Sequence, residues 1–325
     1  MFKMLLFSTA LSAGLAATAL AAETWDLSSE YPASSLQGQA ADLFAKAVRE
    51  KTHGDLEIVV HHGGALGYKG VDQFDAVGDG ALQGASSAFA FWAGIDPIFQ
   101  LSSLPFLAPT IDDVHRLYEL ARPEYARILE DNNQLLLVVS PWPASGLWGN
   151  TAFAAPEDLR QVKVRTYDVA STETMRNAGA FPMQIAWSDV PAQLSTHGID
   201  AVLTSANGGV GVQMWEHQSH FTNVNYAASL QAIHVNRDAF EALSAEDQAA
   251  VMAAAAEAEA LGWSLLDSSV QADYATLRSH GVTVVETISP EFSAFLAKAA
   301  QPFIDDWRTR TGARAQKILD AYFAK

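Results

Sequence analysis

The sequence predicts an α/β protein of two lobes, and three observations lead to this. Strand-like and helix-like segments alternate from residue 24 onward, which is typical of α/β domains. The chain has 325 residues, 49% of them hydrophobic, enough for two domains of about 150 residues with cores of their own. Proline and glycine gather at residues 141–149, where they break both regular structures and indicate a hinge or crossover.

The N-terminal segment, residues 1–22, has the pattern of a secretory signal peptide. Lys3 precedes an apolar run that ends in small residues at Ala19–Ala22. An uncleaved membrane anchor is the weaker alternative, because a spanning helix needs about 20 strongly apolar residues and this run is diluted by serine, threonine, glycine and alanine. We therefore expect cleavage after Ala21 or Ala22 and export to the periplasm.

Composition excludes several classes of function. The chain has no cysteine, so it has no disulfide, no thiolate metal site and no cysteine nucleophile. A formal net charge of -17 argues against binding to nucleic acid or to an anionic membrane surface. An anionic ligand would have to be drawn in by a local cation against this overall field.

The first half of the chain predicts strands and helices in alternation. The strands are expected at residues 24–28, 56–60, 82–90 and 134–140, and the helices at 34–54, 71–77 and 111–129, the last interrupted at Pro123. His61 and His62 are adjacent on a strand and point to opposite faces, so we expect no metal site there. The cluster of Phe89, Phe91 and Trp92 favours a core position, with the alternative that one ring lines a cleft.

The second half continues the pattern. Strands are expected at residues 163–167, 183–185, 199–203, 226–236 and 283–285, and helices at 171–178, from 189, from 212 to 216 and at 290–322. An alanine-rich helix capped by Ser244 extends past Trp263 to about Arg278, with a bend near Gly262. At 1.5 Å per residue this helix is long enough to cross both lobes, the alternative being a simple surface helix.

Arg165 is the residue on which the predicted site depends. Arg165, Trp187 and the Thr204–Ser205 turn all fall at ends of predicted strands, where ligands bind in open α/β sheets. The planar guanidinium suits a carboxylate, because it donates two parallel hydrogen bonds and stays charged. A surface ion pair of Arg165 with Asp158 or Asp189 is the alternative, and spacing alone leaves both open.

Four short motifs around Arg165 resemble the central signature of the substrate-binding subunits of TRAP transporters, the DctP-like extracytoplasmic solute receptors. They are D-L-x-x-V-K-V-R from Asp158, G-A-x-P from Gly179, W-x-D-V-x-x-x-L from Trp187 and G-I-D-A from Gly198. The resemblance extends over the chain beyond the signal peptide and includes the segments at residues 31–35, 64–67 and 104–107. It implies a two-lobed periplasmic binding protein-like fold with a long helix spanning both lobes, an organic-acid ligand whose carboxylate binds Arg165, and TRAP membrane subunits as partners.

The expected lobes are residues 23–145 with about 235–262, and residues 146–234 with about 263–325. Two departures from the family bear on the ligand: Ser145, Leu147 and Trp148 stand where many members have a second arginine, and residues 204–207 replace a Glu-Asn-Pro turn. A lost cation and an added tryptophan favour a smaller or more apolar monocarboxylate, aromatic acids included.

The predicted mechanism is hinge closure around the bound ligand. The expected site residues are Arg165 for the carboxylate, Trp187 and Trp148 against the ligand body, Thr204, Ser205 and Asn207 for hydrogen bonds, and Glu30, Phe89 and Trp92 from the first lobe. No catalytic residue, cofactor or metal is expected, because the G-x-S-x-G, H-E-x-x-H and phosphate-loop patterns are missing from the sequence. A periplasmic ligand sensor and a periplasmic hydrolase are the alternative functions.

Overall fold

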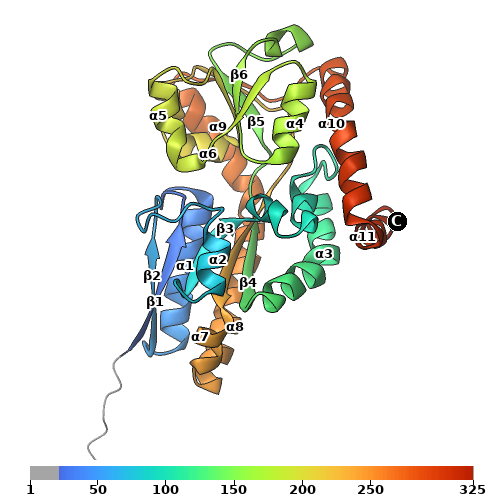
Figure 1. Cartoon of the computed structure of the whole chain (residues 1–325). Coiled ribbons are helices and arrows are strands. Elements are labelled where there is room, and N and C mark those ends of the chain that lie inside the picture. The colour runs from blue at the N-terminus through green and yellow to red at the C-terminus, as the bar shows by residue number, and fades with distance from the viewer. Residues whose placement is uncertain (1–21, 325) are drawn as a thin grey trace, which may run out of the picture.

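A computed structural model describes residues 22–324, and in it the chain forms two lobes, each built on its own sheet (Figure 1). This confirms the predicted two-lobed α/β architecture. The predicted signal peptide lies outside the described residues except for Ala22.

Sheet A, in the first lobe, has five strands in the order β2-β1-β3-β10-β4. β1 pairs in parallel with β2 and β3, whereas β10 runs antiparallel to β3 and β4. The ends of β1, β3 and β4 and the start of β10 therefore lie at one edge. The strands are β1 (Glu23–Ser29), β2 (Leu56–His61), β3 (Gly84–Ala88), β4 (Gln134–Pro141) and β10 (Leu230–Asn236).

Sheet B, in the second lobe, has six strands in the order β11-β9-β5-β8-β6-β7. β6 pairs in parallel with β7 and β8, and β5 runs antiparallel to β8 and β9. Gly146 at the start of β5 is paired with Thr204 at the end of β8, so these ends share an edge. The strands are β5 (Gly146–Gly149), β6 (Lys163–Thr166), β7 (Phe181–Gln184), β8 (Ala201–Thr204), β9 (His220–Thr222) and β11 (Thr283–Val285).

The helices cover both sheets, and many of them begin at polar caps. Ser35 caps α1 and Ser244 caps α8, the latter as predicted, each accepting a hydrogen bond from a backbone N–H of the first turn. The α-helices are α1 (Leu36–Lys51), α2 (Gln73–Gly78), α3 (Ile111–Asp131), α4 (Val169–Asn177), α5 (Val190–Ser195), α6 (Ala206–Gly211), α7 (Arg237–Ala242), α8 (Ala245–Ser264), α9 (Leu266–Ser279), α10 (Pro290–Thr311) and α11 (Ala313–Phe323). The 3₁₀ helices are η1 (Phe89–Gly94), η2 (Pro97–Ser103), η3 (Pro156–Leu159), η4 (Trp187–Asp189) and η5 (Met214–Glu216).

The long alanine-rich helix is a bent pair, α8 and α9, which meet at Leu265 at an angle of 54°. α8 packs on α1 and β4 in the first lobe, and α9 packs on α6 and β11 in the second (Figure 1). The pair therefore spans both lobes, with its bend three residues beyond the predicted Gly262. Among residues 22–324 no single helix is long and apolar enough to cross a membrane, and only this bent pair meets that test, by length and composition alone.

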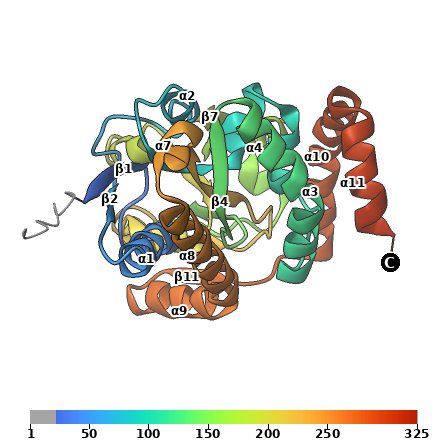
Figure 2. The ribbon, with the colours of Figure 1, turned by 90° about the horizontal axis from the view of Figure 1, so that it is seen from below.

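The C-terminal helices return to the first lobe. α10 packs on α4 of the second lobe and on η2 of the first, and α11 packs on α3 of the first (Figure 2). Trp307, Leu319 and Tyr322 share a core cluster with Phe99 and Tyr125. Of residues 263–325, which were predicted to join the second lobe, α9 and the start of α10 pack there, whereas α11 packs on α3 in the first lobe. The predicted boundary at 234/235 falls inside β10, which pairs in sheet A along its length.

Three local features differ from the sequence prediction. α3 continues through Pro123, which lies on the exposed side of the helix while the opposite face packs into the core. Residues 206–211, for which no helix was predicted, form the short helix α6, which Ser205 caps by accepting from the N–H of Gly208. β5, in the segment expected as a hinge or crossover, and the three-residue β9 were not predicted.

Candidate ligand-binding site

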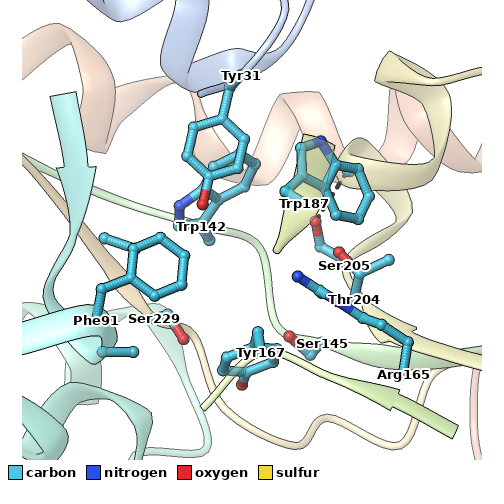
Figure 3. Close-up of a pocket in the computed structure, with 13 residues that line it drawn as sticks. Tyr31, Phe91, Trp142, Ser145, Arg165, Tyr167, Trp187, Thr204, Ser205 and Ser229 are labelled. Atoms are coloured by element: carbon cyan, nitrogen blue, oxygen red, sulfur yellow. Dashed lines mark hydrogen bonds between the residues drawn. The ribbon is translucent and has the colours of Figure 1, made fainter. Parts of the chain in front are cut away.

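A pocket lies between the two lobes (Figure 3). Its walls come from the edges of both sheets where parallel strands end and antiparallel strands begin. In open α/β sheets this edge is where small molecules bind. The lining residues are Tyr31, Ala88, Ala90, Phe91, Trp142, Ser145, Arg165, Tyr167, Trp187, Thr204, Ser205, Gly208 and Ser229.

Arg165 brings the one positive charge among these lining residues. Its side chain comes from β6 and is only 3% exposed. Two backbone carbonyls hold it from behind: Nε donates to Ile185 O at 2.9 Å, and Nη1 donates to Leu203 O at 3.4 Å. The remaining N–H groups, on Nη2 above all, are left for the pocket, where Figure 3 shows the end of the side chain.

Within the described residues Arg165 forms no ion pair. Asp158 accepts hydrogen bonds from the backbone of Ala154 and Ala155, and Asp189 pairs with Lys69 at 2.8 Å. The alternative of a surface ion pair for Arg165 is therefore wrong, since both candidate acids have other partners and the guanidinium is buried.

Burial lowers the pKa of Arg165 to about 10. The nearby Tyr31 and Glu30 oppose that shift, but desolvation is the larger cause. At neutral pH the group is still protonated, so the pocket contains a buried positive charge. A buried charge is costly unless it is paired, and a ligand carboxylate would supply the missing partner.

Aromatic rings form most of the remaining wall. The Cζ atom of Arg165 lies 5.2 Å from the ring centre of Trp187 and 5.9 Å from that of Tyr167, so the two rings flank the cation. Tyr31 and Trp142 pack against each other with ring centres 4.7 Å apart. Figure 3 shows these two rings across the pocket from Tyr167. The pocket therefore offers one charge within a mostly apolar and aromatic enclosure.

Four of the predicted site residues line this pocket: Arg165, Trp187, Thr204 and Ser205. They lie together because β6 and β8 are parallel neighbours and end at the same edge. Ser205 also caps α6, so its hydroxyl already accepts the N–H of Gly208 at 3.0 Å.

Trp148 does not line the pocket, and its prediction as a ligand contact is corrected. It is fully buried, its indole N–H donates to Ser205 O at 3.3 Å, and its ring packs against Phe221. A Cβ atom added at Gly209 would lie 2.0 Å from the Trp148 ring, which shows how closely α6 approaches it. Trp148 therefore supports the wall that carries Ser205.

Phe89 and Trp92 are also corrected, because both are fully buried in the core of the first lobe. They belong to the 3₁₀ helix η1, in which residues three apart share one face. That spacing places Phe89 and Trp92 inward together and leaves Phe91 to line the pocket. Of the two alternatives for this aromatic cluster, two rings are core and one lines the cleft.

Glu30 and Asn207 lie next to the pocket without lining it. The Glu30 carboxylate accepts from the backbone N–H of Gly70 at 3.1 Å and from the Ser188 hydroxyl at 3.4 Å. Burial raises its pKa. Asn207 accepts from the N–H of Leu36 at 3.0 Å. The Ser188–Glu30 and Leu36–Asn207 bonds each join one lobe to the other, whereas the Gly70–Glu30 bond lies within the first lobe.

Sequence reasoning missed five lining residues that carry polar or aromatic groups: Tyr31, Trp142, Ser145, Tyr167 and Ser229. Tyr31, Trp142 and Tyr167 each come one or two residues after a strand, and Ser145 and Ser229 each come directly before one. A search of positions at or just after the ends of predicted strands would have found the three aromatic residues. The directions of β5 and β10, which only the pairing reveals, were needed to place the two serines.

Among residues 22–324 there is no group of three or more histidine, aspartate or glutamate side chains arranged to hold a metal ion. The polar groups of the pocket are hydroxyls and a guanidinium, which suit an organic anion.

Comparison with known proteins gives one family. The DctP model, described as bacterial extracellular solute-binding protein, family 7, matches residues 27–310. Among curated proteins, the chain is 29% identical to a solute-binding protein of Chromohalobacter salexigens, over 91% of this chain and 88% of the relative. It is 26% identical to the ectoine-binding periplasmic protein TeaA of Halomonas elongata, over 94% and 91% of the two chains.

Solved structures agree with this. A Bordetella pertussis extracytoplasmic solute receptor that binds pyroglutamic acid has a TM-score of 0.89 and 30% identity, covering 93% of this chain and 99% of that one. A marine metagenome TRAP solute-binding protein specific for pyroglutamate has a TM-score of 0.88 and 27% identity, with 93% and 99% covered.

Proposed function

The chain belongs to the DctP family of bacterial extracellular solute-binding proteins, and we propose that it captures a small organic monocarboxylate between its lobes for a TRAP transporter. It is a solute receptor, as its relatives are. The ligand would be passed to the membrane subunits of the transporter. The sensor alternative has no support from the relatives reported above, which are named as binding proteins.

One observation carries the proposal: Arg165 is a buried cation with no ion-pair partner among the described residues. Its Nε and Nη1 atoms are fixed by main-chain carbonyls, so its position does not depend on the ligand. A carboxylate placed against the remaining N–H groups would gain charge-assisted hydrogen bonds in a site of low dielectric.

The pocket favours a compact ligand with one carboxylate. Its lining has a single cation, and its aromatic walls suit an apolar ring or short chain. Pyroglutamate, which the two structural relatives bind, has this character, and we propose it as the first candidate. The sequence-based preference for a smaller or more apolar monocarboxylate is in line with this choice.

We infer that ligand binding closes the lobes. The described structure has contacts that join the two lobes, including the Lys69–Asp189 ion pair and the Ser188–Glu30 hydrogen bond. A ligand that touches both lobes adds to these contacts only in the closed form, and so favours closure by its differential affinity.

We also propose a periplasmic location reached through a cleaved signal peptide at residues 1–22, and the absence of turnover. N-terminal sequencing of protein isolated from the periplasm tests the first proposal. Mass analysis of the ligand after long incubation tests the second, because a receptor returns its ligand unchanged.

The decisive experiment is a thermal-shift screen of pyroglutamate, succinate, glucuronate, ectoine and the uncharged 2-pyrrolidone. A ligand at 100 times its Kd stabilises the protein by about 2.7 kcal/mol, which raises the Tm visibly. We expect stabilisation by at least one carboxylate and none by 2-pyrrolidone. Arg165→Met should lose the carboxylate response, whereas Arg160→Met, at an exposed ion pair outside the pocket, should retain it. Equal responses of Arg165→Met and the parent would disprove the assigned role.

A further inference from the structure

Two hydroxyl groups of the pocket, those of Tyr167 and Ser229, are buried and close to each other, but neither makes a hydrogen bond of good geometry within residues 22–324. Ser229 as a residue is 9% exposed, and it directly precedes β10. A buried hydroxyl left without a partner costs about 1 to 3 kcal/mol, so a pair of them on one wall indicates a missing polar group.

We call the part of the pocket formed by Tyr167 and Ser229 its floor. Ser229 lies across the pocket from the guanidinium of Arg165. Figure 3 shows Arg165 entering from one side, Ser229 and Phe91 on the opposite side, and Tyr167 between them. Ser145 and Ser229 lie near enough to the Tyr167 phenol to act against the rise in its pKa that burial causes. A ligand whose carboxylate meets Arg165 would therefore extend its other end toward these hydroxyls.

A carboxyl group adjoins this floor. Asp168, the residue after Tyr167, is 1% exposed, and its Oδ2 atom has no partner among the described residues. Its carboxylate adds to the rise in the pKa of the Tyr167 phenol that burial causes, and burial also raises the pKa of Asp168 itself. Arg165 is the one cation among the lining residues. A second carboxylate on the ligand would thus meet an acidic neighbour and no cation of its own.

We propose, on the basis of the receptor function inferred above, that Tyr167 and Ser229 form a second subsite that takes an uncharged hydrogen-bonding group of the ligand. Each hydroxyl can donate and accept, so the subsite fits a group that does both, of which a lactam amide is the simplest. The ligand class is then a monocarboxylate with a neutral amide, carbonyl or hydroxyl at its far end. Dicarboxylates of equal length are rejected.

Titration calorimetry with three probes tests this. Pyroglutamate has the carboxylate and the lactam, cyclopentanecarboxylate has the same ring size without the amide, and glutarate has a second carboxylate. We expect the parent protein to bind pyroglutamate about 100-fold more tightly than either of the others, because a site built around buried polar groups rejects a ligand that leaves them unpaired.

Tyr167→Phe and Ser229→Ala should each weaken pyroglutamate binding by about 3- to 10-fold and leave cyclopentanecarboxylate within about 2-fold. Tyr68→Phe, at a half-buried phenol that does not line the pocket, is the matched control and should change neither. The Tm of each ligand-free variant shows whether it is folded.

Equal affinity of the parent for pyroglutamate and cyclopentanecarboxylate, or an unchanged ratio in both variants, would overturn the subsite while leaving the receptor function intact. Glutarate binding as tight as that of pyroglutamate would overturn it too. If no carboxylate binds and Arg165→Met behaves as the parent, the receptor proposal itself fails, and the subsite falls with it.

Discussion

The side-chain oxygen of Asn207 accepts a hydrogen bond of 3.0 Å from the backbone N–H of Leu36, and this bond joins the second lobe to the first residue of α1. The nitrogen of the same side chain donates to the Asp273 carboxylate on α9, with 3.1 Å to Oδ2. One buried amide therefore connects three helices, one of them in the opposite lobe.

Replacing Asn207 by alanine should weaken ligand binding by about 5- to 20-fold, because closure would leave the N–H of Leu36 buried without a partner. Calorimetry with a carboxylate ligand measures the change. Asn177→Ala is a suitable control, since Asn177 donates to Ala299 O within the packing of α4 on α10. It should lower the Tm and leave Kd unchanged; a similar loss of affinity in both variants would argue against a role in closure.

Asp273 makes stability depend on pH. Burial raises the pKa of its carboxyl from the ordinary value of 3.8 to about 6. Between these two values the folded protein holds a proton that the unfolded chain has lost, so stability falls as pH rises from about 4 to 6 and then levels off.

Asp273→Asn removes this penalty and keeps an oxygen acceptor for Asn207. The raised pKa of Asp273 corresponds to a loss of roughly 3 kcal/mol at most in the free energy of unfolding at neutral pH. Residual solvent around the carboxyl group reduces this loss to about 1 to 2 kcal/mol. The variant should therefore have a higher Tm than the parent at pH 7.5 and the same Tm at pH 4. Melting curves across this range check it, and a constant difference at every pH would contradict the assignment.

The ion pair of Lys69 and Asp189 should contribute to closure only at low salt. The Lys69 Nζ and Asp189 Oδ2 atoms are 2.8 Å apart across the lobes, but both side chains are 49% exposed, so solvent and salt screen the attraction between them. Lys69→Ala should weaken ligand binding by up to about 5-fold at 20 mM salt and by less than 2-fold at about 1 M salt, where the Debye length is about 3 Å. Lys46→Ala, from a pair within α1, is the control. A salt-independent effect would mean that the pair does not act through its charges.

Gly209→Ala should damage the pocket wall, because the added methyl would lie 2.0 Å from the buried Trp148 ring. Overpacking of this kind costs about 1 to 3 kcal/mol and would displace Ser205, to which Trp148 donates. We expect a lower Tm and weaker binding, with partial recovery in the Gly209→Ala, Trp148→Phe double variant. Gly94→Ala, where an added methyl group has no atom within 4 Å, should change neither the Tm nor ligand binding. No recovery in the double variant would show that another contact limits position 209.

The sequence allowed prediction of the two-lobed α/β fold and of Arg165, and the reasons lie in its local patterns. The segment from Lys163 alternates clearly, and motifs resembling a family surround it, so the strand and the place of Arg165 at the pocket could both be predicted. The Thr204–Ser205 turn was located by the same means. The positions of these residues follow from the sequence immediately around them, which periodicity and motif spacing describe well.

Contacts that depend on helix type or strand direction were not predictable in this way. Choosing Phe91 over Phe89 and Trp92 requires knowing that the segment is a 3₁₀ helix, which three-residue spacing alone does not reveal. Trp148 alternates with Leu147 on β5, and only the position of α6 decides that its ring is covered. Ser229 is placed at the pocket by β10, whose partners are more than 80 residues away in sequence.

The two carbonyls behind Arg165 belong to the main chain, at Ile185 and Leu203, and every amino acid at those positions supplies the same group. The orientation of the cation is thus insulated from side-chain replacement around it. Mutations in Tyr31, Phe91 or Trp142 can remodel the opposite wall and exchange one acid for another, while the electrostatic anchor stays where sheet B puts it. Under the proposed function, single substitutions in the opposite wall would therefore change which acid the protein prefers, while the cation that holds the anion is kept.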